Sequence, residues 1–209
     1  VEEREKAWRL YSMLCAGAWI VPAMSKVTVC NSRRQAEVLF RQAEGAIFPT
    51  DHTPDNPGMS WDKGHAVWHS SLGEELQSFQ APESSKGLMR RWLEPRAKGR
   101  KTIAITLREA TYFPPRNSKL EEWSAFAKKL EDEGYFCIFF RDAATVSDLP
   151  TPELEGFTLF PEAIFSLELR VALYELCYFC MFVSNGPAET AFYNKNVDYL
   201  YFVTGNWLI

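Results

Sequence analysis

A short polar turn after an apolar run offers the clearest chemistry in this sequence. Residues 177–183 are apolar and lead directly into Ser184-Asn185-Gly186-Pro187. The run predicts a buried strand, and the proline suits the first turn of a following helix over 187–194, with Ser184 or Asn185 as its cap. Such a corner directs backbone N–H groups and the positive end of a helix dipole at one point beyond the sheet. The pattern therefore predicts a phosphate site, although many α/β domains use this corner only to turn the chain.

Polar side chains also follow two other predicted strands. Arg108 and Glu109 come after residues 102–107, and Arg116 and Asn117 lie further along the same loop. Asp142 comes after residues 135–140. Parallel sheets bind ligands beyond the carboxyl ends of their strands, so we expect these side chains to bind substrate.

Arginine is well suited to hold phosphate, because its guanidinium group donates paired hydrogen bonds and keeps its charge near neutral pH. We expect Arg108 and Arg116 to clamp a pyrophosphate, with surface ion pairs to nearby glutamates as the alternative. Asn117 and Ser118 are predicted to cap the next helix. Asp142 has two interpretations, a contact with a ribose or base and a helix cap.

Two charged residues lie in a predicted helix over 165–176 that is otherwise rich in Leu, Val and Ala. They are Arg170 and Glu175. A half-buried carboxylate needs a partner, so Glu175 could bind a ribose or sugar hydroxyl. An internal ion pair with an arginine and simple solvation beside Glu168 are the alternatives. We include Arg170 and Glu175 among the candidate substrate-binding residues.

The histidines and cysteines give weaker signals. His65 and His69 have the spacing of two metal ligands on a helix, but nearby glycines and prolines disfavour a helix there and no third ligand is evident. We therefore expect no metal site, and one of His52, His65 and His69 is only a speculative general base. The pair Cys177 and Cys180 is expected to belong to the core.

Strands alternate with helices from residue 98 onward, which predicts an α/β fold with a parallel, Rossmann-like sheet. The expected strands are 102–107, 135–140, 157–160, 177–183 and 199–203, and a helix over 120–132 has apolar residues at helical spacing. Before residue 98 we expect a helix over 3–21, a strand over 27–30 and a helix over 33–43. Residues 46–72 show no periodicity and predict an irregular connector.

Composition limits the classes of function. The chain has 209 residues, 46% hydrophobic residues and a net charge of −4, which argues against general binding to nucleic acid or to an anionic membrane. Five cysteines, an odd number and mostly in apolar runs, favour reduced thiols and a cytoplasmic location. The apolar residues 10–24 are too few to span a bilayer, and peripheral association with the inner membrane face is the minority alternative. The non-Met start and apolar end suggest a fragment.

The predicted elements, in their order, resemble the C-terminal half of a GT-B glycosyltransferase. The resemblance covers residues 98–205 and includes the strand with Arg108, the segment Glu133 to Ile138 and the segment Leu169 to Glu175. Ser184-Asn185-Gly186-Pro187 is similar to the S-N-D-T-G-P corner of heptosyltransferase-type enzymes, with the Asp-Thr pair missing. Arg108 is similar in position to an arginine of fucosyltransferase-like members that faces the donor pyrophosphate.

The resemblance implies a domain organisation and an activity. Residues 1–45 would be the remnant of the N-terminal GT-B domain, 46–97 a connector, and 98–209 the nucleotide-sugar-binding domain. The implied function is metal-independent transfer of a sugar from a nucleotide-diphosphate donor to a glycan or lipid-linked acceptor. The nucleotide sugar is then a substrate, and no cofactor or nucleic acid is expected. A nucleotide-sugar epimerase and a degenerate nucleotide- or protein-binding domain remain as alternatives.

Overall fold

The chain forms two compact units, Val1–Met24 with Ser78–Ile209 and, separately, Ser25–Gln77. The computed structural model describes residues 7, 10–43, 45, 53, 55–56, 78–111, 113–142, 145 and 151–204. In the smaller unit, helix α3 (Arg33–Gln42) begins after Ser32, whose Oγ accepts a hydrogen bond from the Gln35 N–H at 3.2 Å. This cap satisfies one of the N–H groups that the first helical turn leaves without a partner.

A parallel sheet organises the larger unit. Its described strands lie in the order β3-β2-β1-β4-β5. They are β1 (Thr102–Thr106), β2 (Phe136–Phe140), β3 (Thr158–Leu159), β4 (Phe179–Val183) and β5 (Tyr199–Phe202). Thr106 of β1 pairs in register with Phe140 of β2 and Phe182 of β4, so these three strands end at the same edge. The loops that follow them are therefore neighbours in space.

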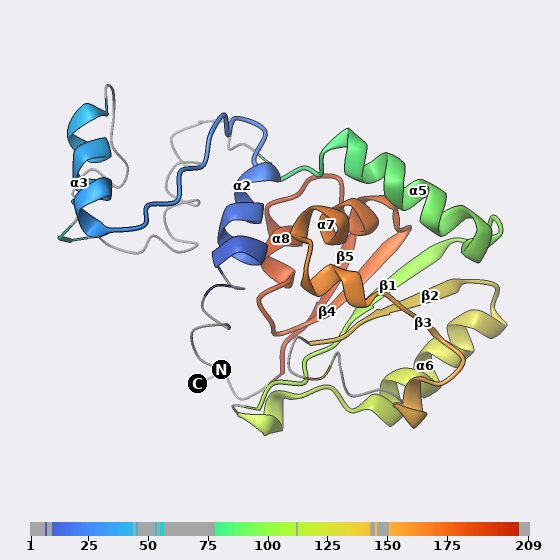
Figure 1. Cartoon of the computed structure of the whole chain (residues 1–209). Coiled ribbons are helices and arrows are strands. Elements are labelled where there is room, and N and C mark those ends of the chain that lie inside the picture. The colour runs from blue at the N-terminus through green and yellow to red at the C-terminus, as the bar shows by residue number, and fades with distance from the viewer. Residues whose placement is uncertain are drawn as a thin grey trace, which may run out of the picture. The chain divides into compact units, whose positions relative to one another are not determined.

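Helices cover both faces of this sheet (Figure 1). Helices α5 (Glu83–Ala97), α7 (Leu167–Leu176) and α8 (Ala188–Phe192) lie on one face together with α2 (Ala16–Trp19), and α6 (Leu120–Asp132) lies on the other. Short helical turns complete the described elements: η1 (Leu10–Cys15), η2 (Pro114–Arg116), η3 (Pro152–Leu154) and η4 (Pro161–Ile164). The predicted bounds of α6 are confirmed, and Gly134, just beyond its end, has a φ of 93° that favours glycine.

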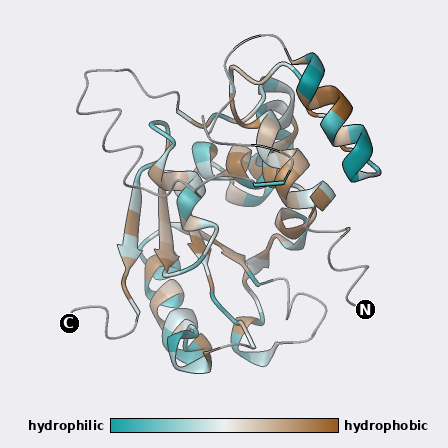
Figure 2. Ribbon diagram, turned by 90° about the vertical axis from the view of Figure 1, so that its left-hand side faces the viewer, coloured by the Kyte–Doolittle hydropathy of each residue, from teal (hydrophilic) through white to brown (hydrophobic). Residues whose placement is uncertain are grey.

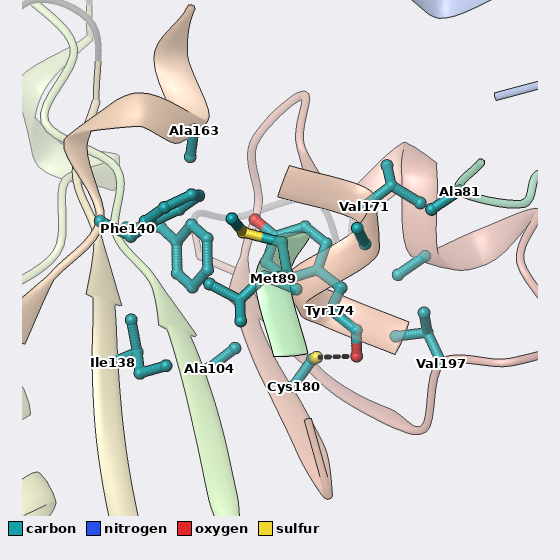
Figure 3. Packing of buried hydrophobic residues seen from close by; sticks show 14 of the residues in the cluster. Ala81, Met89, Ala104, Ile138, Phe140, Ala163, Val171, Tyr174, Cys180 and Val197 are labelled. Atoms are coloured by element: carbon teal, nitrogen blue, oxygen red, sulfur yellow. Dashed lines mark hydrogen bonds between the residues drawn. The ribbon is translucent and has the colours of Figure 1, made fainter. Parts of the chain in front are cut away.

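Alternate residues of the central strands enter two separate hydrophobic clusters, so the strands are apolar on both faces. Figure 2 shows these largely hydrophobic strands between helices of mixed hydropathy. Tyr174 lies at the centre of the larger cluster (Figure 3), with its ring centroid 4.9 Å from that of Phe140 and 5.1 Å from that of Phe182. Its hydroxyl is 2.8 Å from Thr106 Oγ1, and burial raises the pKa of Tyr174 to about 12.

The N-terminal part of the chain differs from the prediction. Residues 27–30 form no strand, because no described segment pairs with them. The larger unit begins well before residue 98, since α5 packs against α7 and places Met89 and Ala97 in the core. Residues 10–19 also belong to this unit, with Ala18 and Ile20 buried. The predicted division at residues 45 and 97 is therefore not the one that the structure has.

Candidate functional site

A cavity of about 390 Å³ lies at the carboxyl edge of the sheet. The loops after β1, β2 and β4 supply most of its wall, as the aligned strand ends require. Charged and polar side chains dominate the lining. It consists of Met13, Leu107, Arg108, Arg116, Arg141, Asp142, Ile164, Arg170, Ser184, Asn185, Gly186, Pro187, Glu189 and Tyr201.

Arg108 is the first basic residue after β1, and only 2% of its surface is exposed. Its Nη1 donates to the carbonyl of Phe113 at 3.3 Å and to Asn117 Oδ1. Asn117 also bonds both backbone groups of Ala110, at 3.1 and 2.9 Å. The loop after β1 is thereby closed on itself, and Arg108 is fixed at the cavity wall.

Arg141, directly after β2, forms a buried bidentate ion pair with Glu109. Its Nε and Nη2 donate to the two carboxylate oxygens at 3.0 and 2.6 Å, and the two side chains are 6% and 8% exposed. The pair joins the loops after β1 and β2. Two further hydrogen bonds of 3.4 Å join the loops. The Glu109 N–H donates to Asp142 Oδ2, and the Asp142 N–H donates to Glu109 Oε2. Glu109 therefore neutralises Arg141 rather than lining the cavity.

Arg170 reaches the cavity from α7 and is 5% exposed. Its Nε donates to the carbonyl of Ala163 at 2.9 Å, which orients the guanidinium group. No described carboxylate forms an ion pair with Arg170. A buried cation without a counterion is costly, since desolvation is not offset by an opposite charge. Arg170 is therefore the strongest structural indication of an anion site.

The corner after β4 is tied to the loop after β1. Arg116 Nη2 donates to the carbonyl of Ser184 at 3.0 Å, and Asn185 Nδ2 donates to the carbonyl of Leu107 at 3.1 Å. Asn185 Oδ1 is buried, and no described residue donates a hydrogen bond to it. A buried acceptor of this kind usually has a partner, which a ligand hydroxyl or amino group could supply.

Eight of the eleven predicted site residues line this one cavity: Arg108, Arg116, Asp142, Arg170, Ser184, Asn185, Gly186 and Pro187. The other three are held by internal partners. Glu109 pairs with Arg141 and Asn117 holds Arg108, as described above. Glu175 accepts from Ala81 N–H at 2.7 Å and from Asn194 Nδ2 at 2.9 Å, and its Oε2 lies 3.1 Å from Lys86 Nζ.

Two predicted helix caps are wrong. Lys119 and Pro187 occupy the cap positions of α6 and α8, and neither makes a side-chain cap hydrogen bond. Ser118 Oγ instead accepts from the Arg108 N–H at 2.9 Å. Helix α8 has only five residues, so its dipole is small. The arginines are thus the main source of positive charge in the cavity.

Several lining residues were not among the predicted ones. Arg141 follows a strand end, so the rule that selected Asp142 could also have selected it. Met13 and Ile164 come from segments that tertiary packing brings to the cavity, and no local pattern marks them. Tyr201 belongs to β5, where a half-buried aromatic residue is as typical of core as of a site.

Neither a metal site nor a membrane-spanning helix is found among the described residues. Across those residues no three His, Cys, Asp or Glu side chains gather in a way that could hold a metal ion. No helix in the described part of the chain is long and apolar enough to cross a bilayer. The three histidines His52, His65 and His69 lie outside the described residues.

The sequence matches no protein-family model and no curated protein. Solved structures with a likeness to this chain include two bacterial proteins. A glycosyl transferase family 9 protein from Veillonella parvula is 14% identical with a TM-score of 0.50, over 79% of this chain and 54% of that one. ADP-heptose LPS heptosyltransferase II from E. coli is 17% identical with a TM-score of 0.41, over 63% and 47%. The chain thus spans about half the length of these proteins.

The first of these similarities establishes the class of fold. The larger unit is a Rossmann-like α/β domain with the fold of that glycosyl transferase family 9 protein, in agreement with the GT-B fold expected from the sequence. The site at its carboxyl edge combines buried arginines with a polar corner, and its ligand follows from chemistry rather than from the fold.

Proposed function

We propose that this chain binds the diphosphate of a nucleotide-sugar donor and is the donor-binding part of a glycosyltransferase-like protein. Arg170 carries this proposal, because it is a buried guanidinium group in the cavity wall without a described carboxylate partner. A phosphate oxygen is the partner that such a group prefers, through charge-assisted hydrogen bonds.

The cavity suits a diphosphate better than a single carboxylate. Arg108 and Arg116 come from the loop after β1, while Arg170 enters from α7, so positive charge surrounds the space from two elements. Asp142 and Asn185 Oδ1 add acceptors that suit ribose or sugar hydroxyl groups. A volume of about 390 Å³ falls within the range of small-molecule sites.

The same charges would serve catalysis. When the bond between the sugar and the diphosphate breaks, negative charge grows on the leaving phosphate. Arginines that are already fixed by Phe113, Asn117, Ala163 and Ser184 stabilise that charge without further reorganisation. Such preorganised electrostatic stabilisation lowers the barrier of the transfer.

The acceptor in this proposal is a saccharide, either a glycan or a lipid-linked sugar. The fold likeness to a glycosyl transferase family 9 protein supports this general class. The chain spans about half of that protein, so the residues that bind the acceptor and remove its proton are expected outside the cavity wall described above.

The test is to incubate the chain with a panel of nucleotide-diphosphate sugars and to measure release of the nucleoside diphosphate, with saccharide acceptors present and absent. Nucleoside diphosphate release that requires an acceptor supports sugar transfer. Slow release without an acceptor supports hydrolysis of the donor by water, and thus cleavage of the sugar–diphosphate bond. Interconversion of the free nucleotide sugar would identify an epimerase instead. Diphosphate binding without any turnover would leave a binding domain and would contradict the enzymatic part of the proposal.

A further inference from the structure

The edge of the sheet opposite the cavity carries an unusual concentration of positive charge. Residues 90–101 contain six basic residues and one acidic residue, a net charge of +5, whereas the whole chain has −4. The rest of the chain therefore carries a net charge of −9. The six are Arg90, Arg91, Arg96, Lys98, Arg100 and Lys101, and all are exposed. We call this surface the basic edge.

Most of this charge is not neutralised by the protein. Arg90 lies 3.9 Å from Glu83, and no described carboxylate forms an ion pair with any of the other five. Helix α5 ends at this edge, and Lys98 and Gly99 follow in left-handed conformations with φ of 51° and 79°. The chain then reverses into β1. This turn brings charges from the end of a helix and the start of a strand together around a pocket of about 310 Å³, which Arg90, Arg100 and Lys101 help to line.

Aromatic rings contact three of the cations of the basic edge. The Arg96 guanidinium carbon lies 4.4 Å from the Trp92 ring centroid, that of Arg100 lies 4.9 Å from the centroid of Phe136, and Lys101 Nζ lies 4.0 Å from that of Tyr178. Cation–π contacts orient the charged groups without neutralising them.

We propose that the basic edge binds the surface of an anionic lipid bilayer. A cluster of four to eight basic residues on a helix is typical of surfaces that bind anionic lipids. The inference does not depend on the proposed donor site.

Nucleic acid is the less suitable polyanion for this surface. Proteins that hold single strands stack bases on open aromatic faces, but the rings of Trp92, Phe136 and Tyr178 are each covered by a basic side chain. An anionic bilayer surface is bound through charge and needs no such open ring.

The geometry has a consequence for the cavity. Because the strands are parallel, their carboxyl ends and the cavity lie at one edge, and the basic edge includes the start of β1 at the other. A chain bound through the basic edge would therefore keep the cavity open on the side away from the lipid surface.

The experiment measures sedimentation of the full chain with phosphatidylglycerol-containing and pure phosphatidylcholine vesicles, at ionic strengths of about 0.05 and about 0.5 M, since salt screens the attraction. The test variant is Arg91→Gln, Lys98→Gln, Lys101→Gln. The control, Arg33→Gln, Arg34→Gln, Arg41→Gln, changes the net charge equally but on α3. Melting temperatures show whether both variants fold.

We expect binding to anionic vesicles only, loss of binding at the high ionic strength, and a partition constant lowered on the order of a hundredfold in the test variant. The control should bind within a few-fold of the unmodified chain. The proposal is overturned if the unmodified chain does not bind anionic vesicles, if the control loses as much binding as the test variant, or if short DNA binds the edge more tightly than the vesicles do.

Discussion

Replacing Arg170 with glutamine should separate ligand binding from stability. The guanidinium group is 5% exposed and has no described carboxylate partner, so the substitution leaves no opposite charge stranded in the interior. It removes one hydrogen bond to the Ala163 carbonyl, worth about 1 kcal/mol, and it also removes the cost of burying a charge. We expect the free energy of unfolding of the ligand-free chain to change by no more than about 1 kcal/mol.

Affinity for a diphosphate should respond much more strongly. A hydrogen bond to a charged phosphate contributes about 1.5–3 kcal/mol, which corresponds to a loss of about ten- to a hundredfold in affinity. Isothermal titration with nucleoside diphosphates measures this loss, and urea denaturation without ligand measures stability.

Arg141→Gln is the matched control, because it removes the same charge from the same cavity. This change leaves Glu109 buried and unpaired, since the bidentate pair is lost, and should destabilise the chain by about 3–5 kcal/mol. If Arg170→Gln destabilises the chain as much as Arg141→Gln and leaves diphosphate affinity unchanged, Arg170 has a structural role and the reasoning is refuted.

Three further predictions concern other parts of the larger unit. Glu175→Gln should lower the free energy of unfolding by about 2 kcal/mol, because Lys86 loses its buried counterion and keeps only the exposed Glu83, 2.6 Å away, and a change below about 0.5 kcal/mol in urea denaturation would contradict this. Gly186→Ala should not change stability, since a Cβ there meets nothing within 4 Å, but it should weaken diphosphate binding in titrations; unchanged affinity would place the ligand away from the corner. Stability should fall as pH rises from about 10 through about 12, because the native state holds the Tyr174 proton more tightly than the unfolded state does. Tyr174→Phe should reduce this loss by about 3 kcal/mol, and an unchanged pH profile by denaturation would be the contrary result.

Sequence periodicity was sufficient for the order of elements in the larger unit. Buried strands of a parallel sheet are short apolar runs between turn residues, and all five predicted strands are present within a few residues of their expected bounds. Residues 27–30 show the limit of this signal. Their composition suits a strand, but a strand needs a neighbour for its backbone hydrogen bonds, and no described segment supplies one.

The location of the site was predictable because parallel strands end at a common edge. The roles of individual side chains were harder to predict, because each role depends on hydrogen-bond partners that are distant in the sequence. Glu175 binds the N–H of Ala81, 94 residues earlier, and pairs with Lys86 rather than with an arginine. Asn117 binds Arg108 and Ala110 instead of capping α6. In both cases the polar side chain forms hydrogen bonds with a group elsewhere in the chain, and the local sequence does not show that the two lie close together.

The proposed function rests on the binding of a diphosphate in the arginine-lined cavity. The most direct test is the melting temperature of the full chain with a panel of nucleoside diphosphates, their sugars and the matching monophosphates, beside Arg108→Ala and Arg170→Gln. A ligand at about a hundred times its Kd adds about 2.7 kcal/mol to stability. We expect a clear rise with one diphosphate, a smaller rise with its monophosphate, and a reduced rise in either variant, since a Kd ten- to a hundredfold weaker leaves only about 0.4–1.4 kcal/mol of stabilisation. Diphosphate binding in the cavity would be contradicted if no nucleotide raised the melting temperature of a well-folded sample. It would also be contradicted if the rise in both variants equalled that of the unmodified chain.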